Sequence, residues 1–312
     1  MNIKPRALEK GDFVGIISPS TTIFSENLKF ALKSIKRMGF RVKFNDRILH
    51  PRLYTIEEDK LRADDINGMF RDDSVKAILH AKGGYGLIRV LPYIDIETIV
   101  KHPKIVVGYS DATVFLSFLL GKCNMTAFHG PMVMGEITRH MSHIRKNSFM
   151  NAVTSTKPLG MIKHRKISVL KHGRASGMLV GGCLTSLTHM LGTPYELDTR
   201  GKILFLEDVS EYYSHFDEML FHMKLAGKFD NVKGIVFGEM INCGTRRGLI
   251  ERIKETLREY NIPMLFGFPS GHSPTNLTVP FGVKVTIDTK IPGINFTETA
   301  LKSNERVTYG TK

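Results

Sequence analysis

A serine in a sharp turn is the first candidate for chemistry in this sequence. Ser110 stands between Gly108 and Ala112, after the apolar run 105–107 and before the apolar segment 113–120. A strand, a Gly-x-Ser turn and a helix form the layout of a nucleophile elbow, which lifts a serine hydroxyl off the end of a sheet. The N-terminus of such a helix supplies backbone N–H groups that suit an oxyanion. Because the second glycine of the motif is Ala112 here, a serine that only caps a core helix is the alternative.

The histidines and one glutamate supply the partners that a serine nucleophile requires, because a base must take the serine proton and a carboxylate usually orients that base. Among twelve histidines, His272 lies in a Gly- and Pro-rich loop, and His129 follows a strand as the next candidate. His189 falls in an apolar helix, where we expect it to pack. Glu207 ends a strand of four apolar residues, so it should be buried and paired with a cation or a histidine. The residues therefore favour Ser110, His272 and Glu207 as a triad, with a salt bridge of Glu207 to lysine or arginine as the alternative.

A glycine-rich turn at 82–86 follows the apolar strand 75–79. Glycine allows a close backbone approach to a ligand and accepts a positive φ. The spacing matches neither a dinucleotide-binding fingerprint nor a P-loop. Since the strand that carries this turn should neighbour the serine strand, the backbone of Gly83 and Gly84 is a candidate oxyanion donor. A plain tight turn is the alternative.

Strands and helices alternate strictly over the first part of the chain. The predicted strands are 13–17, 40–44, 75–79 and 105–107, and the predicted helices are 28–38, 55–69 and 113–120. Thr55 followed by Glu58 is a capping box at the start of the second helix. This alternation predicts an open parallel sheet of flavodoxin or Rossmann type, with helices on both faces. Ligands bind at the carboxyl ends of such strands, where Ser18, Gly83 and Ser110 all fall.

The alternation breaks in a polar, basic stretch from about residue 151 to residue 174. Beyond it the predicted strands are 202–206 and 234–238, the predicted helices are 185–191, 216–225 and 249–260, and the tail alternates from 277 to 287 as paired strands would. We therefore predict an N-terminal α/β domain at 1–155 that carries the serine, and a linker at 156–174. A mixed α/β domain rich in strands follows at 175–312 and carries the glutamate and the histidine.

The composition is that of an ordinary globular protein, with 312 residues, 42% apolar and 24% charged. No apolar run reaches the length of a membrane span and no secretory signal is present, so we expect no membrane partner. Three widely spaced cysteines form no disulfide framework, which favours a reducing cytoplasm. The net charge of +14 is spread along the chain, without a basic tail or an RNA-binding motif, so nucleic acid is not an expected partner.

The residues give no reason to expect a metal site. His140 and His143 are three residues apart, but no HExxH motif or Cys/His cluster accompanies them. This pair is interpreted as one solvated face of a helix.

Taken together, these motifs resemble the LD-carboxypeptidase family of the muramoyl-tetrapeptide type, which includes self-immunity peptidases for microcin C-like compounds. The motifs that carry the resemblance are 17–20, 82–86, 91–95, 108–112, 129–131, 181–182, 206–208, 267–269 and 271–272. The resemblance implies a serine peptidase without a cofactor, with Ser110 as nucleophile, His272 as base and Glu207 as the orienting acid. It also implies an oxyanion hole from the backbone of Asp111 and of the Gly83–Gly84 turn, a site between two domains, and a homodimer.

Two positions depart from the family pattern, and both fall among the expected substrate contacts Ser18, Lys82, Tyr85 and Cys183. The glycine turn is usually preceded by arginine, but Lys82 cannot make the forked contact of a guanidinium with a carboxylate. The glycine pair 181–182 is commonly followed by asparagine, whereas the thiol of Cys183 is a weak donor. Cys183 as a nucleophile is a minor alternative.

The expected reaction is hydrolysis of the amide to the terminal D-amino acid of a murein tetrapeptide, through an acyl-enzyme, in peptidoglycan recycling. One alternative keeps the triad and cleaves an aminoacyl-nucleotide amide, as a microcin C immunity peptidase does; an aromatic platform for a nucleobase would favour it. A second alternative is an esterase of the α/β-hydrolase type, but the GxSxG motif of those enzymes is absent from this sequence. A non-catalytic α/β protein that binds a small ligand is the alternative from another class.

Overall fold

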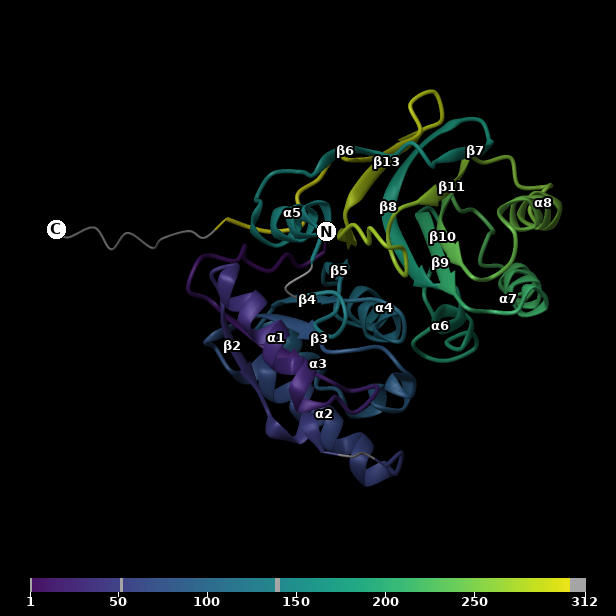
Figure 1. The fold of residues 1–312 in the computed structure, drawn as a ribbon. Helices are drawn as coiled ribbons and strands as arrows, with labels where there is room; N and C mark the ends of the chain where they lie inside the picture. Colours follow the sequence, from purple (N-terminus) through teal and green to yellow (C-terminus); the bar gives the residue numbers. More distant parts are fainter. Residues whose placement is uncertain (1, 51–52, 138–140, 304–312) are drawn as a thin grey trace.

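The chain folds around two β-sheets that lie side by side (Figure 1). The structure is a computed structural model, and it describes residues 2–50, 53–137 and 141–303. The mixed α/β class predicted from the sequence is confirmed.

The first sheet has six strands in the order β12-β5-β4-β3-β1-β2. They are β1 (Phe13–Ile17), β2 (Arg41–Phe44), β3 (Val75–His80), β4 (Ile105–Gly108), β5 (Ala127–His129) and β12 (Val279–Phe281). Neighbouring strands pair in parallel, except that β12 is antiparallel to β5. The predicted parallel sheet is therefore present, and it receives one further strand from the C-terminal part of the chain.

Three helices of this half lie where the periodicity predicts them, at 28–38, 55–69 and 113–120, and a fourth, at 96–101, was not predicted. They are α1 (Ser25–Arg37), α2 (Ile56–Arg71), α3 (Ile96–Lys101) and α4 (Ala112–Lys122). The side chain of Thr55 accepts a hydrogen bond from the backbone N–H of Glu58, so the predicted cap of α2 is confirmed. After the glycine turn the chain forms two 3₁₀ turns, Leu87–Arg89 and Leu91–Tyr93, and Pro92 lies at the start of the second.

The second sheet has eight strands in the order β6-β14-β13-β8-β9-β10-β11-β7. They are β6 (Gly160–Lys163), β7 (Ser168–Lys171), β8 (Arg174–Cys183), β9 (Ile203–Val209), β10 (Gly234–Ile241), β11 (Met264–Phe268), β13 (Lys284–Asp288) and β14 (Gly293–Phe296). The four central strands β8 to β11 are parallel, and the outer strands pair antiparallel.

The segment 156–174, expected to be a linker, contributes β6 and β7 to opposite edges of this sheet. These strands are short, and β6 alternates between exposed and half-buried residues, so their apolar signal is weak. Strand β12 comes from the C-terminal part of the chain but lies in the first sheet. The division into domains 1–155 and 175–312 with a linker at 156–174 stays a prediction.

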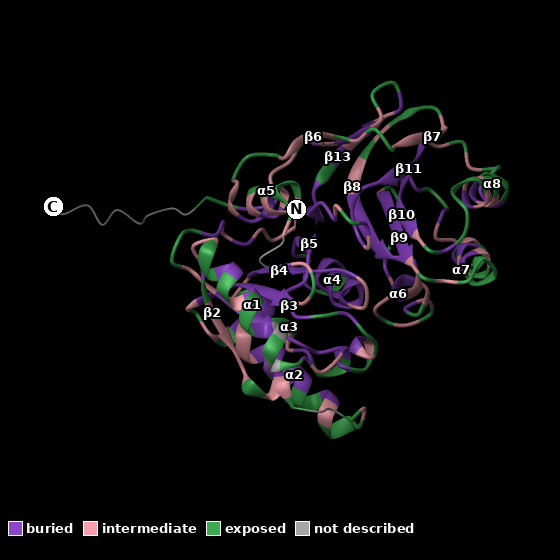
Figure 2. Cartoon of the chain, viewed as in Figure 1, coloured by how far each residue is buried: buried purple, intermediate pink, exposed green. Residues whose placement is uncertain are grey.

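The remaining helices are α5 (His143–Thr154), just before the predicted linker, and α6 (Leu184–Thr188), α7 (Tyr213–Leu225) and α8 (Arg246–Thr256) after it. Figure 2 shows buried central strands β9 and β10, while α7 and α8 expose their outer faces. Helix α6 is shorter than predicted, since its α-helical residues end at Thr188.

Helix α4 contacts both sheets, β4 and β5 in the first and β8 in the second. Its first nine residues, Ala112 to Leu120, are buried. It packs on β8 so closely that a β-carbon at Gly182 would lie 2.4 Å from the Thr113 side chain. The Thr113 hydroxyl also accepts a hydrogen bond from the backbone N–H of Cys183 at 3.1 Å. The start of α4, and with it Ser110, is therefore held at the junction of the sheets.

Candidate active site

Ser110 occupies a strained turn between β4 and α4. Its φ is +60°, a left-handed conformation that a residue other than glycine adopts at a cost of about 1–3 kcal/mol. The neighbouring glycine is required by space, because a β-carbon at Gly108 would lie 2.7 Å from Ala112 and 3.0 Å from the His80 ring. The Ser110 carbonyl accepts the backbone N–H of Thr113 at 2.8 Å, which begins the helix. The turn has the geometry of a nucleophile elbow.

Glu207 and His272 form a hydrogen-bonded pair within the second half of the chain. Glu207 lies in β9 and is fully buried, and its Oε2 is 2.8 Å from His272 Nδ1. The same oxygen accepts the backbone N–H of His272 at 3.0 Å. Because Nδ1–H donates to the carboxylate, Nε2 of the ring is left free to accept a proton.

The pair shifts the proton affinity of both groups. Burial alone would raise the pKa of Glu207, but the hydrogen bond and charge of His272 outweigh it and bring this pKa below its ordinary value. Burial alone would lower the pKa of His272, but the hydrogen bond and charge of Glu207 raise it above 6.5. The pair therefore favours a carboxylate beside an imidazolium, the state that a general base reaches during catalysis.

One cavity of about 610 Å³ brings Ser110 and His272 together. Its lining includes Ser110 and Tyr85 from loops of the first sheet and Thr185, Asp208 and His272 from the second half. The Tyr109 ring packs edge-on against the His272 ring, with centroids 4.7 Å apart. The two halves of the predicted triad thus meet at one hollow between the sheets.

The glycine turn lies directly beside the serine. A β-carbon at Gly83 would be 3.0 Å from Ser110 Oγ, and Gly84 has a φ of +143° that favours glycine. Asp111 precedes the first helical residue of α4, and its carboxylate accepts the backbone N–H of Leu87 at 3.2 Å. Burial raises the pKa of Asp111. This side-chain contact ties the segment after the glycine turn to the serine elbow.

The four expected substrate contacts separate into two groups. Tyr85 and Cys183 line the cavity. Lys82 is exposed, and Ser18 is buried with its hydroxyl donated to the Thr21 carbonyl. Neither Ser18 nor Lys82 is among the described residues that line the cavity.

His189 corrects one sequence prediction. It was expected to pack in an apolar helix, but it is exposed and lines the cavity. The reason is that α6 ends at Thr188, so the residue after it leaves the packed face. Its neighbours in the cavity include Asp208, which belongs to the sequence motif 206–208, and Glu211, which the sequence analysis did not single out. The position of Glu211 soon after the apolar strand 202–206 was the available signal.

Asp208 and Cys183 line the cavity near α6. Asp208 accepts hydrogen bonds at 2.8 Å from the backbone N–H and from the hydroxyl of Thr185, and the Cys183 thiol lies 3.6 Å from its other oxygen. Burial raises the pKa of Asp208, and burial likewise raises the pKa of Cys183 well above its usual range. Cys183 is therefore held as a thiol, which is a poor nucleophile.

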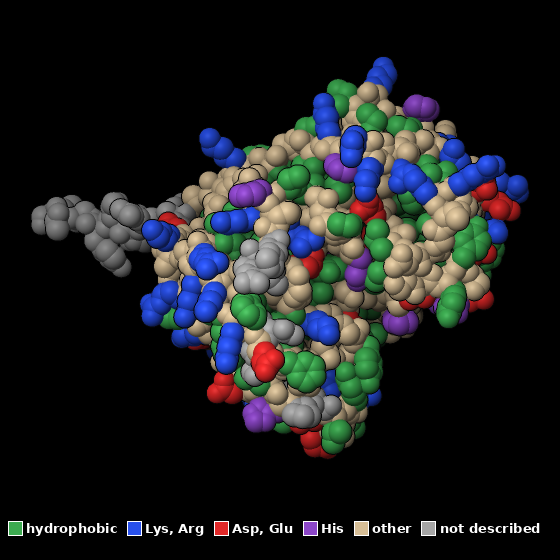
Figure 3. Space-filling view, in the orientation of Figure 1, with side chains coloured by type: hydrophobic (Ala, Val, Ile, Leu, Met, Phe, Trp, Pro, Cys, Tyr) green, Lys and Arg blue, Asp and Glu red, His purple; other side chains and the backbone are tan. Residues whose placement is uncertain are grey.

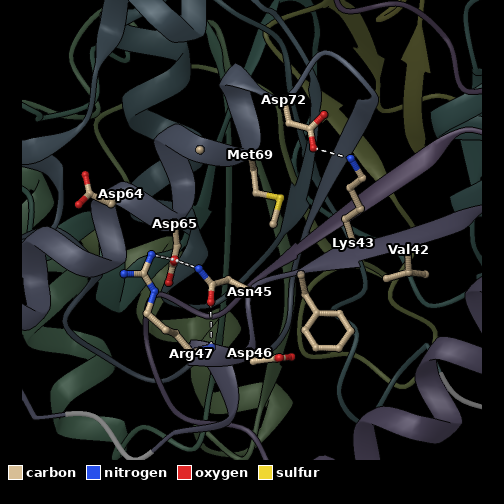
Figure 4. A pocket seen from close by; sticks show the side chains of 11 residues that line it. Val42, Lys43, Asn45, Asp46, Arg47, Asp64, Asp65, Met69 and Asp72 are labelled. Atoms are coloured by element: carbon tan, nitrogen blue, oxygen red, sulfur yellow. Dashed lines mark hydrogen bonds and ion pairs between the residues drawn. The ribbon is translucent and has the colours of Figure 1, made fainter.

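A second hollow of about 740 Å³ lies between β2 and α2 (Figure 4). Strands β3 and β1 separate its strand from that of the serine. Lys43 pairs with Asp72 at 2.7 Å, and Arg47 pairs with Asp65 at 2.6 Å. Asp46 and Asp64 also line this hollow, and none of the three residues of the predicted triad does.

Three further observations concern the molecule as a whole. Lys and Arg side chains are scattered over the face drawn in Figure 3 rather than gathered into one stripe. Within the described residues no group of three or more His, Cys, Asp or Glu side chains is placed to hold a metal ion. His140, one member of the histidine pair noted above, lies outside them. In the described part of the chain no helix is long and apolar enough to cross a bilayer.

An elbow serine that shares a cavity with a histidine–carboxylate pair is the arrangement of a serine-type hydrolase. Sequence profiles of the LD-carboxypeptidase N-terminal and C-terminal domains match residues 14–130 and 176–287. The probable murein peptide carboxypeptidase of Bacillus subtilis (strain 168) is 37% identical over 295 residues, which cover 93% of this chain and 92% of that protein.

Two solved structures are similar over nearly the whole chain. The microcin C7 self-immunity protein MccF, in its wild-type apo state, superposes with a TM-score of 0.89 at 27% identity, over 96% of this chain and 100% of that one. The muramoyltetrapeptide carboxypeptidase of Oxalobacter formigenes superposes with a TM-score of 0.79 at 27% identity, over 91% and 97%.

The chain belongs to the LD-carboxypeptidase family and is an enzyme of the carboxypeptidase class. This finding overturns the alternative of a non-catalytic ligand-binding protein. It also replaces the esterase alternative, because the matched fold is that of LD-carboxypeptidases.

Proposed function

We propose that this enzyme hydrolyses the amide to the terminal D-amino acid of murein tetrapeptides through an acyl-enzyme on Ser110. The observation that carries the proposal is the 2.8 Å hydrogen bond between Glu207 and His272. His272 lines the same cavity as Ser110, the serine with the strained backbone. The similarity to proteins named murein peptide and muramoyltetrapeptide carboxypeptidase supports the substrate class.

The first half of the reaction forms the acyl-enzyme. The Ser110 hydroxyl gives its proton to His272 Nε2 while its oxygen bonds to the substrate carbonyl carbon. The carbonyl oxygen becomes an oxyanion beside the backbone N–H groups of the Gly83–Gly84 turn and Asp111, and each such donor contributes about 3 kcal/mol. His272 then returns the proton to the amide nitrogen, the C–N bond breaks, and the D-amino acid leaves.

The second half regenerates the serine. A water molecule gives a proton to His272 while its oxygen attacks the ester carbonyl of the acyl-enzyme. The ester bond breaks, Ser110 recovers its proton from His272, and the shortened peptide leaves with a new carboxylate. Glu207 stays ionised throughout and stabilises the imidazolium that forms twice in each cycle.

The cavity walls suit a peptide that carries charges of both signs. His189 and Arg89 supply basic groups, with the Arg89 guanidinium also paired with Asp59 at 2.8 Å, and Asp208 and Glu211 supply acidic ones. The free carboxylate of the terminal residue would meet the basic side, and an ammonium group on the preceding residue would meet the acidic side. Lys82 is exposed outside the described cavity lining, so in this proposal Arg89 and His189 take the carboxylate in its place.

The test is release of D-alanine from a tetrapeptide that ends in D-alanine, with wild type and Ser110→Ala compared. We expect turnover by wild type and a loss of at least about a thousandfold in the variant. Equal release by both would remove Ser110 from the chemistry. The same peptide with L-alanine at its end measures the preference for the D configuration.

A second candidate, cleavage of an aminoacyl-nucleotide amide, is favoured by one observation. Tyr85 lines the cavity, is 61% exposed and stacks on Tyr54 with ring centroids 4.2 Å apart. Such a pair is a platform on which a nucleobase can stack. Both substrates should be offered to wild type and to Tyr85→Leu. A nucleotide function predicts that Tyr85→Leu loses the aminoacyl-nucleotide reaction selectively.

We further propose that the enzyme acts in cytoplasmic peptidoglycan recycling as a homodimer. The three cysteines are free and buried, which suits a reducing compartment, and the family resemblance implies the dimer. Light scattering on the purified enzyme would measure the mass in solution. A monomer at micromolar concentration would contradict the dimer.

A further inference from the structure

The two oxygens of the Glu207 carboxylate have different surroundings. Oε2 takes both hydrogen bonds from His272. Oε1 is buried and has no hydrogen-bond partner among the described residues. When an ionised carboxylate is buried and one of its oxygens receives no hydrogen bond, the desolvation of that oxygen costs about 1–3 kcal/mol or more. The site as described so far does not supply that donor.

The nearest candidate donor is His129, at the end of β5 in the other sheet. Its Nε2 lies 3.8 Å from Glu207 Oε1, and both side chains are fully buried. Neither ring nitrogen of His129 has a hydrogen-bond partner among the described residues. An orphan acceptor and an orphan donor thus face each other just outside hydrogen-bonding distance.

Aromatic rings hold His129 in this orientation. Phe205 and Phe281 pack against it with centroids 5.3 and 5.4 Å away, and Tyr109 packs at 5.9 Å. Tyr109 in turn packs on His272 with ring centroids 4.7 Å apart, so the same ring contacts both histidines. The groups with charge or protons that face His129 are therefore Glu207 and His272, with the Tyr109 hydroxyl hydrogen-bonded to Glu136.

We propose that His129 is a positioning residue whose neutral imidazole donates Nε2–H to Glu207 Oε1 and so fixes the carboxylate that orients His272. The proposal rests on the triad of the proposed function and adds a fourth member to it. A small tilt of either side chain closes 3.8 Å to a hydrogen bond. Burial lowers the pKa of His129 to about 4, although the charge of Glu207 acts in the opposite direction, so the ring is neutral at pH 7.

Loss of this donor has a defined effect on the pH profile. Without it, the negative charge shared by Glu207 and His272 is less stabilised, so the pair takes up its proton at a higher pH. The neutral His272 that accepts the serine proton then exists only at higher pH. The acid limb of the activity profile must therefore move upward, which a purely structural role of His129 would not produce.

The experiment compares His129→Phe, which keeps a ring without a donor, with His129→Gln, whose amide N–H reaches the position of Nε2. His80→Phe is the matched control, because His80 is also fully buried without hydrogen-bond partners among the described residues but packs on Phe115. Two readouts are measured from pH 5 to 9 in the full-length enzyme. They are kcat/KM for the tetrapeptide and the rate of Ser110 labelling by a fluorophosphonate.

We expect His129→Phe to lose about ten- to a hundredfold in kcat/KM, the size of one hydrogen bond to a charged group. Its acid limb should move upward by about one pH unit in both readouts. We expect His129→Gln to stay within about threefold of wild type, with its acid limb unmoved. His80→Phe should leave the limb unmoved as well.

Two results would overturn the inference while the proposed function stands: a limb unmoved in His129→Phe, or equal losses in the Phe and Gln variants. If the Phe variant does not fold, His129→Asn replaces it, since its shorter amide cannot reach Oε1. The limb should then move in the Asn variant and not in the Gln variant, and identical profiles would reject the idea. Failure of wild type to label at Ser110 would instead reject the proposed function, and the inference with it.

Discussion

Gly271 lies against the carboxyl group of Glu207, so that a β-carbon at residue 271 would be 2.3 Å from the carboxyl carbon. Its φ of +90° also belongs to the region that favours glycine. The absence of a side chain at residue 271 is what allows the loop to bring His272 onto Glu207. The active-site geometry therefore requires glycine at residue 271 as well as histidine at residue 272.

Replacement of this glycine tests the requirement. We expect Gly271→Ala to lower kcat/KM by a hundredfold or more, because the methyl group must displace the Glu207 carboxylate from His272. Gly11→Ala is the matched control, since Gly11 has a similar φ of +96° and its added β-carbon would meet nothing within 4 Å. The control should lose only the backbone cost, about 1 kcal/mol of stability, and keep its activity. Similar activity losses in both variants would contradict the contact argument.

The Glu207–His272 pair sets the acid limb of the activity profile. The pKa of His272 is raised above 6.5, so the neutral base and the activity should be lost as the pH falls through a value above 6.5. In Glu207→Gln the hydrogen bond and charge of Glu207, the two largest causes that raise this pKa, are altered or lost, while burial and the weaker charges of Asp208 and Glu136 remain, so the limb should move downward. At its optimum this variant should be slower by about 10³- to 10⁴-fold. Measurement of kcat/KM from pH 5 to 9 in wild type and in Glu207→Gln checks both the shift of the limb and the lower rate. An acid limb at the same pH in the two proteins would exclude His272 as the titrating base.

The strain at Ser110 predicts a stability gain in an inactive variant. Ser110→Gly should remove the cost of the +60° φ, partly offset by the greater freedom of glycine in the unfolded chain. We expect it to be about 1 kcal/mol more stable than Ser110→Ala, which keeps the strained conformation. Urea unfolding of both inactive variants measures the difference. An alanine variant at least as stable as the glycine variant would show that the turn stores no strain.

The elements around the serine could be predicted because each has a local signal. Apolar runs mark β1, β3 and β4, Thr55 marks the start of α2, and a Gly-x-Ser turn marks the elbow. Glu207 follows four apolar residues, and it is buried at β9 as that position requires. These features follow from side-chain polarity and backbone sterics within a few residues.

Contacts between distant segments had no such signal. The pairing of β12 with β5 joins segments about 150 residues apart, and the short strands β6 and β7 pair with the sheet through distant segments of the chain. The 3.8 Å approach of His129 to Glu207 depends on how the two sheets lie together. His189 was misplaced because the length of α6 is set by packing on α4 and α7 rather than by its own periodicity.

The cysteines should not take part in the reaction. Burial raises the pKa of Cys123 to about 12, that of Cys243 to about 11, and that of Cys183 well above its usual range, so each is a thiol at pH 8. Because iodoacetamide reacts with thiolates, the native enzyme should keep its activity after treatment at pH 8. The unfolded chain should take up three alkyl groups, as mass spectrometry will count. Inactivation with alkylation of Cys183 alone would revive the thiol as nucleophile.

His80 should make the folded state sensitive to acid independently of the active site. It is fully buried, and burial lowers its pKa from 6.5 to about 3. The unfolded chain therefore binds a proton below pH 6.5 that the folded chain does not, and stability falls as the pH drops from 6.5 toward 3. Between pH 6.5 and 5 this one group should account for about 2 kcal/mol. In His80→Phe the loss of unfolding free energy over that interval should be smaller than in wild type by this amount, and urea unfolding at the two pH values measures it. Equal losses in both proteins would mean that His80 gains access to water in the folded state.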